Sequence, residues 1–372
     1  MSVKITERLV ALDAFRGLTI AMMILVNTPG SWSYVYPPLR HAHWHGCTPT
    51  DLVFPFFLFI VGVAMRFSYA KFNYKLNVGL TKKIIGRTIT IFLIGLSLNA
   101  FPFIRQNWDY STLRILGVLQ RIALAYGAAA FLVLVLKDRQ QWITALSILF
   151  GYWFLMWALG GDNPYSLEHN LARTIDLALL GESHVWHGTG IPFDPEGLFS
   201  TLPAIVTVML GYNVGRWIQQ GGSNNDMVFS LVKIGALWTF SGWIWDWFFP
   251  INKQLWTSSY VLYTGGLATL FLALFIWIID IKGYKKMVFP FVIFGTNSIF
   301  VFAASGLWVK SIIRFKFDLN GEIVNGYTYL YQTVFVPLAG NMNGSLLFAL
   351  SHILGWWLVL YWLYQKKIYI KI

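Results

Sequence analysis

The chain has 372 residues, of which 56% are hydrophobic, 18% aromatic and 12% charged, and its net charge is +12. A soluble domain carries about 25% charged residues, so this composition excludes a water-soluble surface. It indicates a polytopic membrane protein, in which the 18 Trp, 18 Tyr and 30 Phe would serve membrane interfaces and helix packing.

Ten segments are apolar over roughly the 20 residues that a membrane-spanning helix needs. They lie at about 17–36, 50–70, 84–103, 114–136, 141–159, 198–218, 228–249, 256–279, 287–309 and 343–364. No second domain, internal repeat or low-complexity segment is evident between them. We therefore predict an all-α polytopic membrane protein in which residues 1–372 form a single transmembrane domain.

The distribution of charge predicts the orientation of these helices. An even number of spans places both termini on one side of the membrane. With the termini in the cytoplasm, roughly two thirds of the Lys and Arg residues fall on the cytoplasmic side, as the positive-inside rule requires. The net charge is then explained by topology, and nucleic acid is excluded as a partner. No cleavable signal peptide is expected before the first helix.

The first predicted helix begins with LDAFRG, in which Asp13 and Arg16 are three residues apart and share one helical face. They form either a local ion pair or a ligand site. Asn27 lies further along the same helix, where an amide serves either an interhelical hydrogen bond or a function.

Three histidines, His41, His43 and His45, follow in the stretch HAHWHG, which runs directly into the second apolar segment. Three imidazoles could hold a catalytic zinc, one of them could act as a general base or nucleophile, or all could be satisfied loop residues. Asp51 is the one nearby acid. The neighbouring Cys47 is either an acyl-accepting thiol or a small apolar filler, and nothing around it is arranged to lower its pKa.

Polar residues also interrupt the later helices. Arg121 in RILGVLQR lies two turns into an apolar helix and needs a partner or an anion. Asn297 and Ser298 interrupt the ninth helix, where they serve either helix packing or a ligand.

Two long stretches, 160–197 and 310–341, fall outside the membrane under this topology. The first contains Trp186, Asp194 and Glu196, a mixture too structured for a linker.

These motifs together resemble the heparan-α-glucosaminide N-acetyltransferase family of transmembrane acetyltransferases. The resemblance is carried, in order, by LDAFRG, Asn27, HAHWHG with TDLVFPFFLFIVG, RILGVLQRIALAY, LLGESHVWHGTGIPFDPEGLFSTLPAI, FPINKQLWTSSYVL, IIDIKG, TNSIFVF and YWLYQKKIYIKI. HAHWHG and FDPEG together are specific, whereas LDxxRG occurs in other membrane acyltransferases. The resemblance covers nearly the whole chain and implies a compact bacterial member without the N-terminal lumenal domain of the animal lysosomal enzyme.

The resemblance implies a reaction as well as a fold. Members transfer the acetyl group of cytoplasmic acetyl-CoA, the co-substrate, to the amine of a terminal glucosamine on the far side of the membrane. The histidine of the family's motif is His41, which would be the general base or a transient acetyl acceptor, and Asn27 would donate to the thioester oxyanion. The family commonly has Asn at position 45, so His45 is expected to be dispensable.

The remaining site residues follow from the same resemblance. Arg16 and Arg121 would contact the phosphates or pantetheine amides of the co-substrate, and Asn297 and Ser298 would line its nucleotide end. A further group would hold the cationic amino sugar of a heparan sulfate or other glucosamine acceptor. This group comprises Asp194, Glu196, Trp44 and Trp186.

The expected environment is the lipid bilayer of a bacterial inner membrane, without a metal, and a homodimer is left open. The rival classes are an amino-sugar transporter without chemistry and a metal-dependent membrane hydrolase using the three histidines.

Overall fold

The structure, a computed structural model, describes residues 9–221 and 224–370, which divide into two compact units. Among the described residues, unit 1 is formed by 9–12, 43–47, 55–221 and 224–283, and unit 2 by 13–42, 48–54 and 284–370. The expectation of a single functional domain stays a prediction, because two compact units can serve one function.

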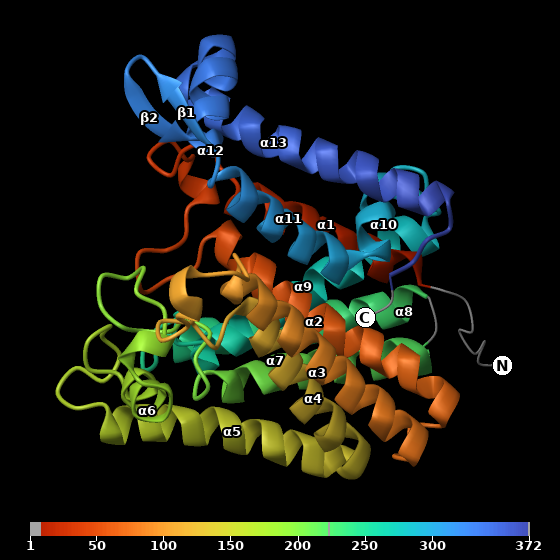
Figure 1. Ribbon diagram of the computed structural model, residues 1–372. Coiled ribbons are helices and arrows are strands. Elements are labelled where there is room, and N and C mark those ends of the chain that lie inside the picture. The colour runs from red at the N-terminus through yellow and green to blue at the C-terminus, as the bar shows by residue number, and fades with distance from the viewer. Residues whose placement is uncertain (1–8, 222–223, 371–372) are drawn as a thin grey trace. The chain divides into compact units, whose positions relative to one another are not determined.

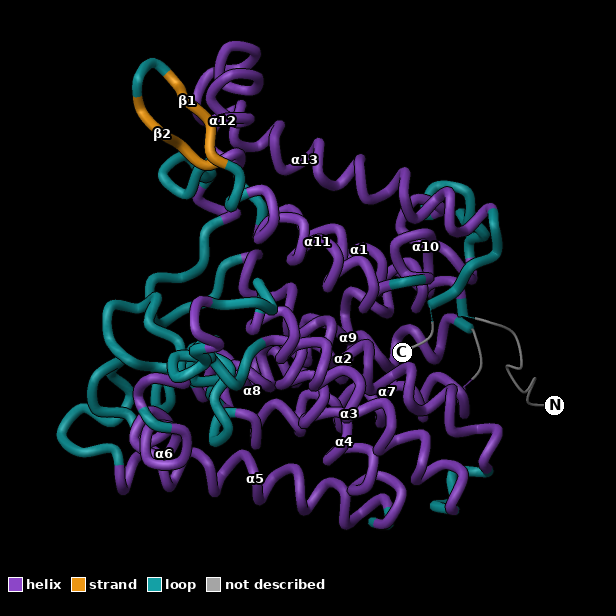
Figure 2. Tube along the Cα trace, viewed as in Figure 1, coloured by secondary structure: helices purple, strands orange, loops and turns teal. Residues whose placement is uncertain are grey.

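Unit 1 is a bundle of long helices (Figure 1). It holds most of α2 (Pro49–Tyr69), and α3 (Val78–Ala100), α4 (Val118–Val135), α5 (Asp138–Leu159), α6 (Leu171–Leu180), α7 (Thr201–Gly221), α8 (Asn225–Trp245) and α9 (Ser258–Phe275). The helix α8 packs along α9, and α3 packs along α4. Figure 2 shows the loops 101–117 and 160–200 of this unit gathered at one end of its helices.

The helix α7 is the centre of unit 1, with neighbours α4, α5, α8 and α9. It approaches α2 closely through two glycines. A Cβ atom on Gly62 would lie 2.0 Å from the carbonyl oxygen of Val208, and one on Gly211 would lie 2.0 Å from that of Phe59. Small residues allow helix backbones to pack at such distances in membrane proteins.

Unit 2 contains the rest of the chain, including a short antiparallel hairpin. Its elements are most of α1 (Val10–Asn27), then α10 (Phe289–Thr296), α11 (Ser298–Ile312), β1 (Lys316–Leu319), β2 (Glu322–Asn325), α12 (Gly326–Leu330) and α13 (Val336–Gln365). The helices α10 and α11 form one bent pair with an angle of 81° between them, and Asn297 lies at the break. The helix α13 is kinked at Gly340, whose φ is 72°.

The all-α polytopic membrane fold predicted from the sequence is confirmed. Within the described residues, 8 helices are long and apolar enough to cross a membrane, and the number is 9 if the bent pair is one span. A helix occupies each of the ten expected places. The helix at the sixth place, 198–218, is α7, which is not among these spans; it carries Asn213 and Arg216, and other helices bury it along most of its length.

The predicted boundary of the first helix was wrong. It was expected at about 17–36, whereas α1 begins at Val10 and ends at Asn27. LDAFRG lies in the first two turns of α1, as its helical spacing predicted, so the error lies in the bounds taken from the apolar run alone. It ends where Pro29 and Gly30 follow, since proline disfavours a helical conformation in the residue before it.

Candidate functional site

The clearest constellation for chemistry in unit 2 joins His41 to Asp51. The Nδ1 atom of His41 lies 2.6 Å from Oδ1 of Asp51. Asp51 lies in the first turn of α2 and is 1% exposed, whereas His41 is an exposed loop residue. The pair therefore links a buried carboxylate to an imidazole at the surface.

The second oxygen of Asp51 is also engaged. Oδ2 accepts the backbone N–H groups of Ala42 at 2.9 Å and Thr48 at 3.0 Å. A carboxylate that accepts such bonds in the first turn of a helix is stabilised in its charged form. It can then accept the Nδ1 hydrogen of His41, and an imidazole that donates from Nδ1 carries its lone pair on Nε2. The same division of roles is found in Ser-His-Asp triads.

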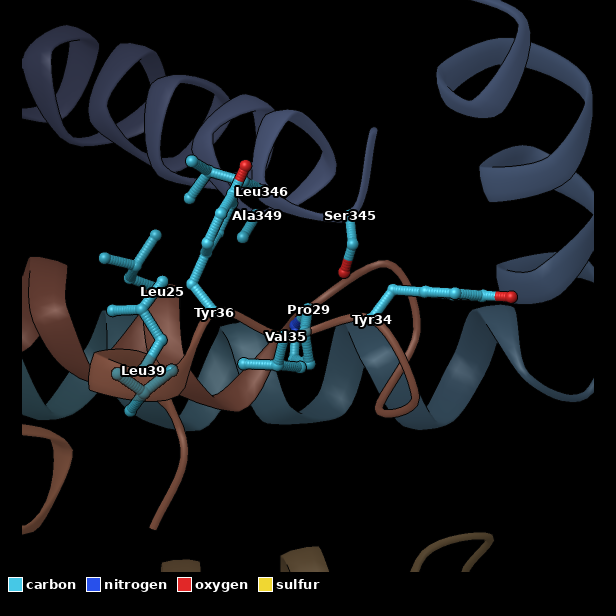
Figure 3. Close-up of a pocket in the computed structure, with 10 residues that line it drawn as sticks. Leu25, Pro29, Tyr34, Val35, Tyr36, Leu39, Ser345, Leu346 and Ala349 are labelled. Carbon is cyan, nitrogen blue, oxygen red and sulfur yellow. The ribbon is translucent and has the colours of Figure 1, made fainter. Parts of the chain in front are cut away.

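The segment that leads to His41 is anchored on α13. Tyr36 donates its hydroxyl hydrogen to Oδ1 of Asn343 at 2.5 Å. Figure 3 shows the ring of Tyr36 lying against Leu346 and Ala349 of the same helix. The backbone before His41 is thus fixed by packing within unit 2.

Asn27 is the last residue of α1, and its side chain is exposed. It borders a cavity of about 790 Å³ that lies within unit 2. Its amide makes no hydrogen bond to the residues that the structure describes. Its role as the oxyanion donor stays a prediction.

The other two histidines of the loop belong to unit 1. The Nδ1 atom of His45 lies 3.4 Å from Nδ2 of Asn252, and burial lowers the pKa of His45 while the Asp246 carboxylate opposes the shift. In residues 9–221 and 224–370, no group of three or more His, Cys, Asp or Glu side chains is placed to hold a metal ion. The absence of a metal stays a prediction.

Arg114 organises the two carboxylates of the FDPEG motif in unit 1. Its Nε and Nη2 atoms lie 2.9 and 2.7 Å from the oxygens of Asp194, and Nη2 lies 2.6 Å from Oε2 of Glu196. Its guanidinium lies 5.0 Å from the ring centre of Trp186. A sugar ammonium bound to Asp194 or Glu196 would have to share them with Arg114.

Trp44 was grouped with these residues in the sequence analysis. Its indole N–H donates to the carbonyl oxygen of Tyr165 at 2.8 Å, and its ring lies edge-on to Phe193 at 5.6 Å. Phe193 precedes Asp194, so Trp44 belongs to the same loop region of unit 1 as FDPEG.

Arg121 lies in the first turn of α4 and is 1% exposed. It donates from Nη2 to the carbonyl oxygen of Gly197 at 3.1 Å and to Oγ of Ser200, and its guanidinium lies 5.1 Å from the ring centre of Trp256. Its Nε and Nη1 atoms have no hydrogen-bond partner among the described residues. A buried guanidinium with unused donors is suited to a ligand oxygen.

Asp176 of α6 holds the chain that leads into α7. Its Oδ1 atom accepts the backbone N–H groups of Leu198 at 2.9 Å and Phe199 at 3.3 Å, and it is 1% exposed. Burial raises the pKa of Asp176 to about 6, although these two hydrogen bonds act in the opposite direction. The carboxyl group therefore becomes charged in the folded protein only above mildly acidic pH.

Asp176→Asn is expected to remove a pH-dependent loss of stability. The folded pKa of about 6 lies above the unfolded value of about 3.9, so stability is fully present below about pH 4 and falls as the pH rises to about 6. The loss amounts to about 3 kcal/mol. Thermal unfolding across this range should show the stability of the variant increasing relative to that of the wild type as the pH rises.

The exposed Asp162 offers a matched control in the same stretch, 160–197. Asp162→Asn should track the wild type at every pH. A difference between Asp176→Asn and the wild type that stays constant with pH would contradict the assignment.

The residues assigned to the nucleotide end lie in unit 2, near the break between α10 and α11. Arg16 donates from Nη1 to Oδ1 of Asp13 at 3.4 Å and to the carbonyl oxygen of Gly295 at 3.3 Å, so the local ion pair predicted as one alternative is present. Ser298 donates to the same carbonyl at 3.3 Å.

Asn297 binds the C-terminal segment. Its amide donates to the carbonyl oxygen of Ile368 at 3.2 Å and accepts the N–H of Ile370 at 2.7 Å. It is 1% exposed. A nucleotide at this side chain would have to displace part of that segment, and the assignment stays a prediction.

Sequence reasoning assigned no role to Arg114 or Asp176. Arg114 is 80 positions from Asp194, so no local pattern shows the pairing. Asp176 lies in a short helix within a stretch expected to be a loop. Asp51 had a usable signal, since it was the one acid near the histidines.

Comparison with known proteins gives consistent results. The family model described as "Heparan-alpha-glucosaminide N-acetyltransferase, catalytic" matches residues 8–246. The chain is 28% identical to the human protein named heparan-alpha-glucosaminide N-acetyltransferase over 425 aligned residues, covering 98% of this chain and 60% of that protein. It is 27% identical to the mouse protein of the same name, covering 98% and 61%. The chain thus spans about three fifths of the length of these relatives.

Proposed function

The chain belongs to the heparan-α-glucosaminide N-acetyltransferase catalytic family, and on that basis we propose that it is a transmembrane N-acetyltransferase. Its co-substrate is cytoplasmic acetyl-CoA, and its acceptor is the amine of a glucosamine-type sugar on the outer face. The names of the human and mouse relatives support the reaction class. The observation that carries the proposal is the pair of His41 and Asp51, which are 2.6 Å apart.

In the proposed reaction, the sugar amine attacks the carbonyl carbon of the thioester. Nε2 of His41 takes the proton that the amine loses, while Asp51 stabilises the resulting imidazolium. The carbon–sulfur bond then breaks, and the leaving thiolate takes the proton from His41. A route through a transient acetyl group on His41 uses the same nitrogen and remains an alternative.

Asn27 is proposed as the donor to the oxygen that becomes negative in this step. Its exposed amide at the edge of the large cavity of unit 2 supports the assignment. One such hydrogen bond contributes about 3 kcal/mol of transition-state stabilisation in other acyl transfers.

The co-substrate is proposed to contact residues at both ends of its length. Arg16, with a side chain 23% exposed, suits a phosphate, and Asn297 and Ser298 are proposed near the nucleotide. Arg121 lies in the first turn of α4, at the outer end under the predicted topology. Its unused donors therefore suit a pantetheine amide or the thioester better than a phosphate.

The acceptor's amine is proposed to lie near Asp194 and Glu196, with Trp44 or Trp186 against the sugar ring. Arg114 neutralises part of the charge of both acids, so recognition there would depend on hydrogen bonds as well as charge. The predicted environment remains a lipid bilayer of the bacterial inner membrane, and a homodimer remains open.

An amino-sugar transporter is the alternative that one structural feature favours. The bend of 81° between α10 and α11 makes a discontinuous helix, a feature of many transporters. In transporters built from repeats such helices occur in matched pairs, whereas only one pair of helices in the described residues is both apolar enough to span a membrane and bent at a short break. Family membership favours the enzyme.

Reconstituted vesicles separate the two functions. Protein in liposomes is supplied with acetyl-labelled acetyl-CoA on the cytoplasmic face and glucosamine on the other. We expect labelled N-acetylglucosamine in the glucosamine compartment, and no product when the acetyl-CoA is omitted. Uptake of unmodified glucosamine without any acetylated product would refute the enzyme and support the transporter.

A further inference from the structure

The large cavity of unit 2 is built from five segments. They are the end of α1, the following loop, the β1–β2 hairpin with the end of α11, the α12 region and the start of α13 (Figure 1). Its volume of about 790 Å³ falls within the range of small-molecule sites, about 300–1,000 Å³. The sequence analysis assigned a role to only one lining residue, Asn27.

The lining has a distinctive chemistry. Four of these five segments contribute amide side chains, and the amide residues are Asn27, Asn320, Asn325, Gln332 and Asn341. An amide offers both two donor hydrogens and an acceptor oxygen, which suits the neighbouring hydroxyl groups of a sugar. No Lys, Arg, Asp or Glu is among the lining residues, so the site lacks the charges that would bind sulfate or carboxylate groups.

Aromatic rings complete the lining. Trp32 is 65% exposed and Tyr34 is 39% exposed at the cavity, so both can offer a face to a ligand. Tyr327 and Tyr331 are fixed in place, because their hydroxyls donate to the carbonyl oxygens of Pro29 at 2.7 Å and Asn341 at 2.9 Å. Amphipathic rings of this kind combine apolar contact with a polar edge.

Most of the amides are available to a ligand. The side chain of Asn325 accepts the N–H of Thr328 at 2.9 Å, which begins α12. The amides of Asn320, Gln332 and Asn341 make no hydrogen bond to other described residues.

We propose that this cavity binds the uncharged sugar units of an oligosaccharide acceptor, next to the unit whose amine is acetylated. The proposal rests on the proposed function, because Asn27 joins the cavity to the reacting thioester. It extends that function by naming the acceptor class: a short oligosaccharide whose bound units carry neither sulfate nor carboxylate. The predicted topology places this end of α1 outside the membrane, where a sugar rather than a nucleotide arrives.

Binding can be tested without acetyl-CoA. The probes are triacetylchitotriose, an uncharged trisaccharide, and a heparin-derived sulfated tetrasaccharide, titrated calorimetrically into the purified protein. We expect the uncharged probe to bind with an affinity that is insensitive to salt, and the sulfated probe to bind at least about tenfold more weakly, since the lining offers it no cation.

Two variants locate the site. Trp32→Ala should weaken binding of the uncharged probe about tenfold, because an aromatic face is lost, and Asn341→Ala should weaken it as well. Trp108→Ala is the matched control, since Trp108 is a loop tryptophan with 66% exposure outside the cavity lining, and it should leave the affinity unchanged.

The outcomes separate this inference from the proposed function. Equal or tighter binding of the sulfated probe, an unchanged affinity in Trp32→Ala, or competition between acetyl-CoA and the trisaccharide would overturn the cavity assignment. If the wild type acetylates glucosamine but does not bind the trisaccharide, only this inference fails. If it binds the trisaccharide in a Trp32-dependent way but transfers no acetyl group, only the proposed reaction fails.

Discussion

His41→Ala is expected to reduce acetyl transfer by a factor on the order of 10² or more, within the usual effect of a lost general base, while acetyl-CoA still binds. The reason is the geometry of the ring. Nδ1 is held 2.6 Å from a buried carboxylate, so Nε2 is the nitrogen that we propose to exchange a proton with the amine. The loss of acetyl transfer is measured by initial rates with glucosamine at saturating acetyl-CoA. The retained binding is measured by titrating acetyl-CoA into the same preparation.

The neighbouring residues supply the controls for this prediction. His45→Asn should be tolerated, because the Nδ1 atom of His45 lies 3.4 Å from the Asn252 amide, away from the pair of His41 and Asp51. His43→Ala should also keep most of the activity. If His41→Ala retains near-wild-type turnover while His43→Ala abolishes it, the wrong imidazole has been assigned.

Asp51→Asn refines the assignment. The substitution keeps the shape of the side chain but removes the negative charge that stabilises the imidazolium. It can also reverse the tautomer of His41. We expect a large fall in kcat with little change in thermal stability, because the imidazolium formed in the step loses the carboxylate that stabilises it. A loss of activity that only parallels a loss of folded protein would instead mean that Asp51 serves only the fold.

The helices could be predicted from the sequence because each apolar run is long enough to cross a membrane. The exception shows the limit of this reasoning. The helix α7 is placed by its neighbours rather than by lipid, so its composition is less apolar than that of a lipid-facing span. The apolar run placed the start of α1 too late because Asp13 and Arg16 interrupt it; in the structure both belong to α1, and Arg16 donates to Asp13 at 3.4 Å.

Residue roles were predictable only where partners are close in sequence. Asp51 is ten positions from His41 and was recognised as the one acid near the histidines. The partners of Arg114 lie in a distant loop. The amides of the unit 2 cavity come from segments as far apart in the sequence as Asn27 and Asn341. Such sets become visible only after folding.

Arg114→Ala is expected to lower the free energy of unfolding by about 3–5 kcal/mol, the usual effect of removing one partner of a buried ion pair. The side chain of Asp194 is 0% exposed and that of Arg114 is 22% exposed. Without the guanidinium, the Asp194 carboxylate keeps a backbone hydrogen bond from Glu196 at 2.9 Å but has lost the cation that offsets its desolvation. Thermal unfolding in one detergent, followed by tryptophan fluorescence, measures the change.

Arg139→Ala is the matched control, because Arg139 is exposed and its removal should change stability by less than about 0.5 kcal/mol. Combining Arg114→Ala with Asp194→Ala completes a double-mutant cycle. If the pair is coupled, the double variant should be more stable than the sum of the two single losses predicts. Additive losses, or an Arg114→Ala variant as stable as Arg139→Ala, would show that the ion pair does not hold FDPEG. The carboxylates would then be available to the amino sugar without competition from Arg114.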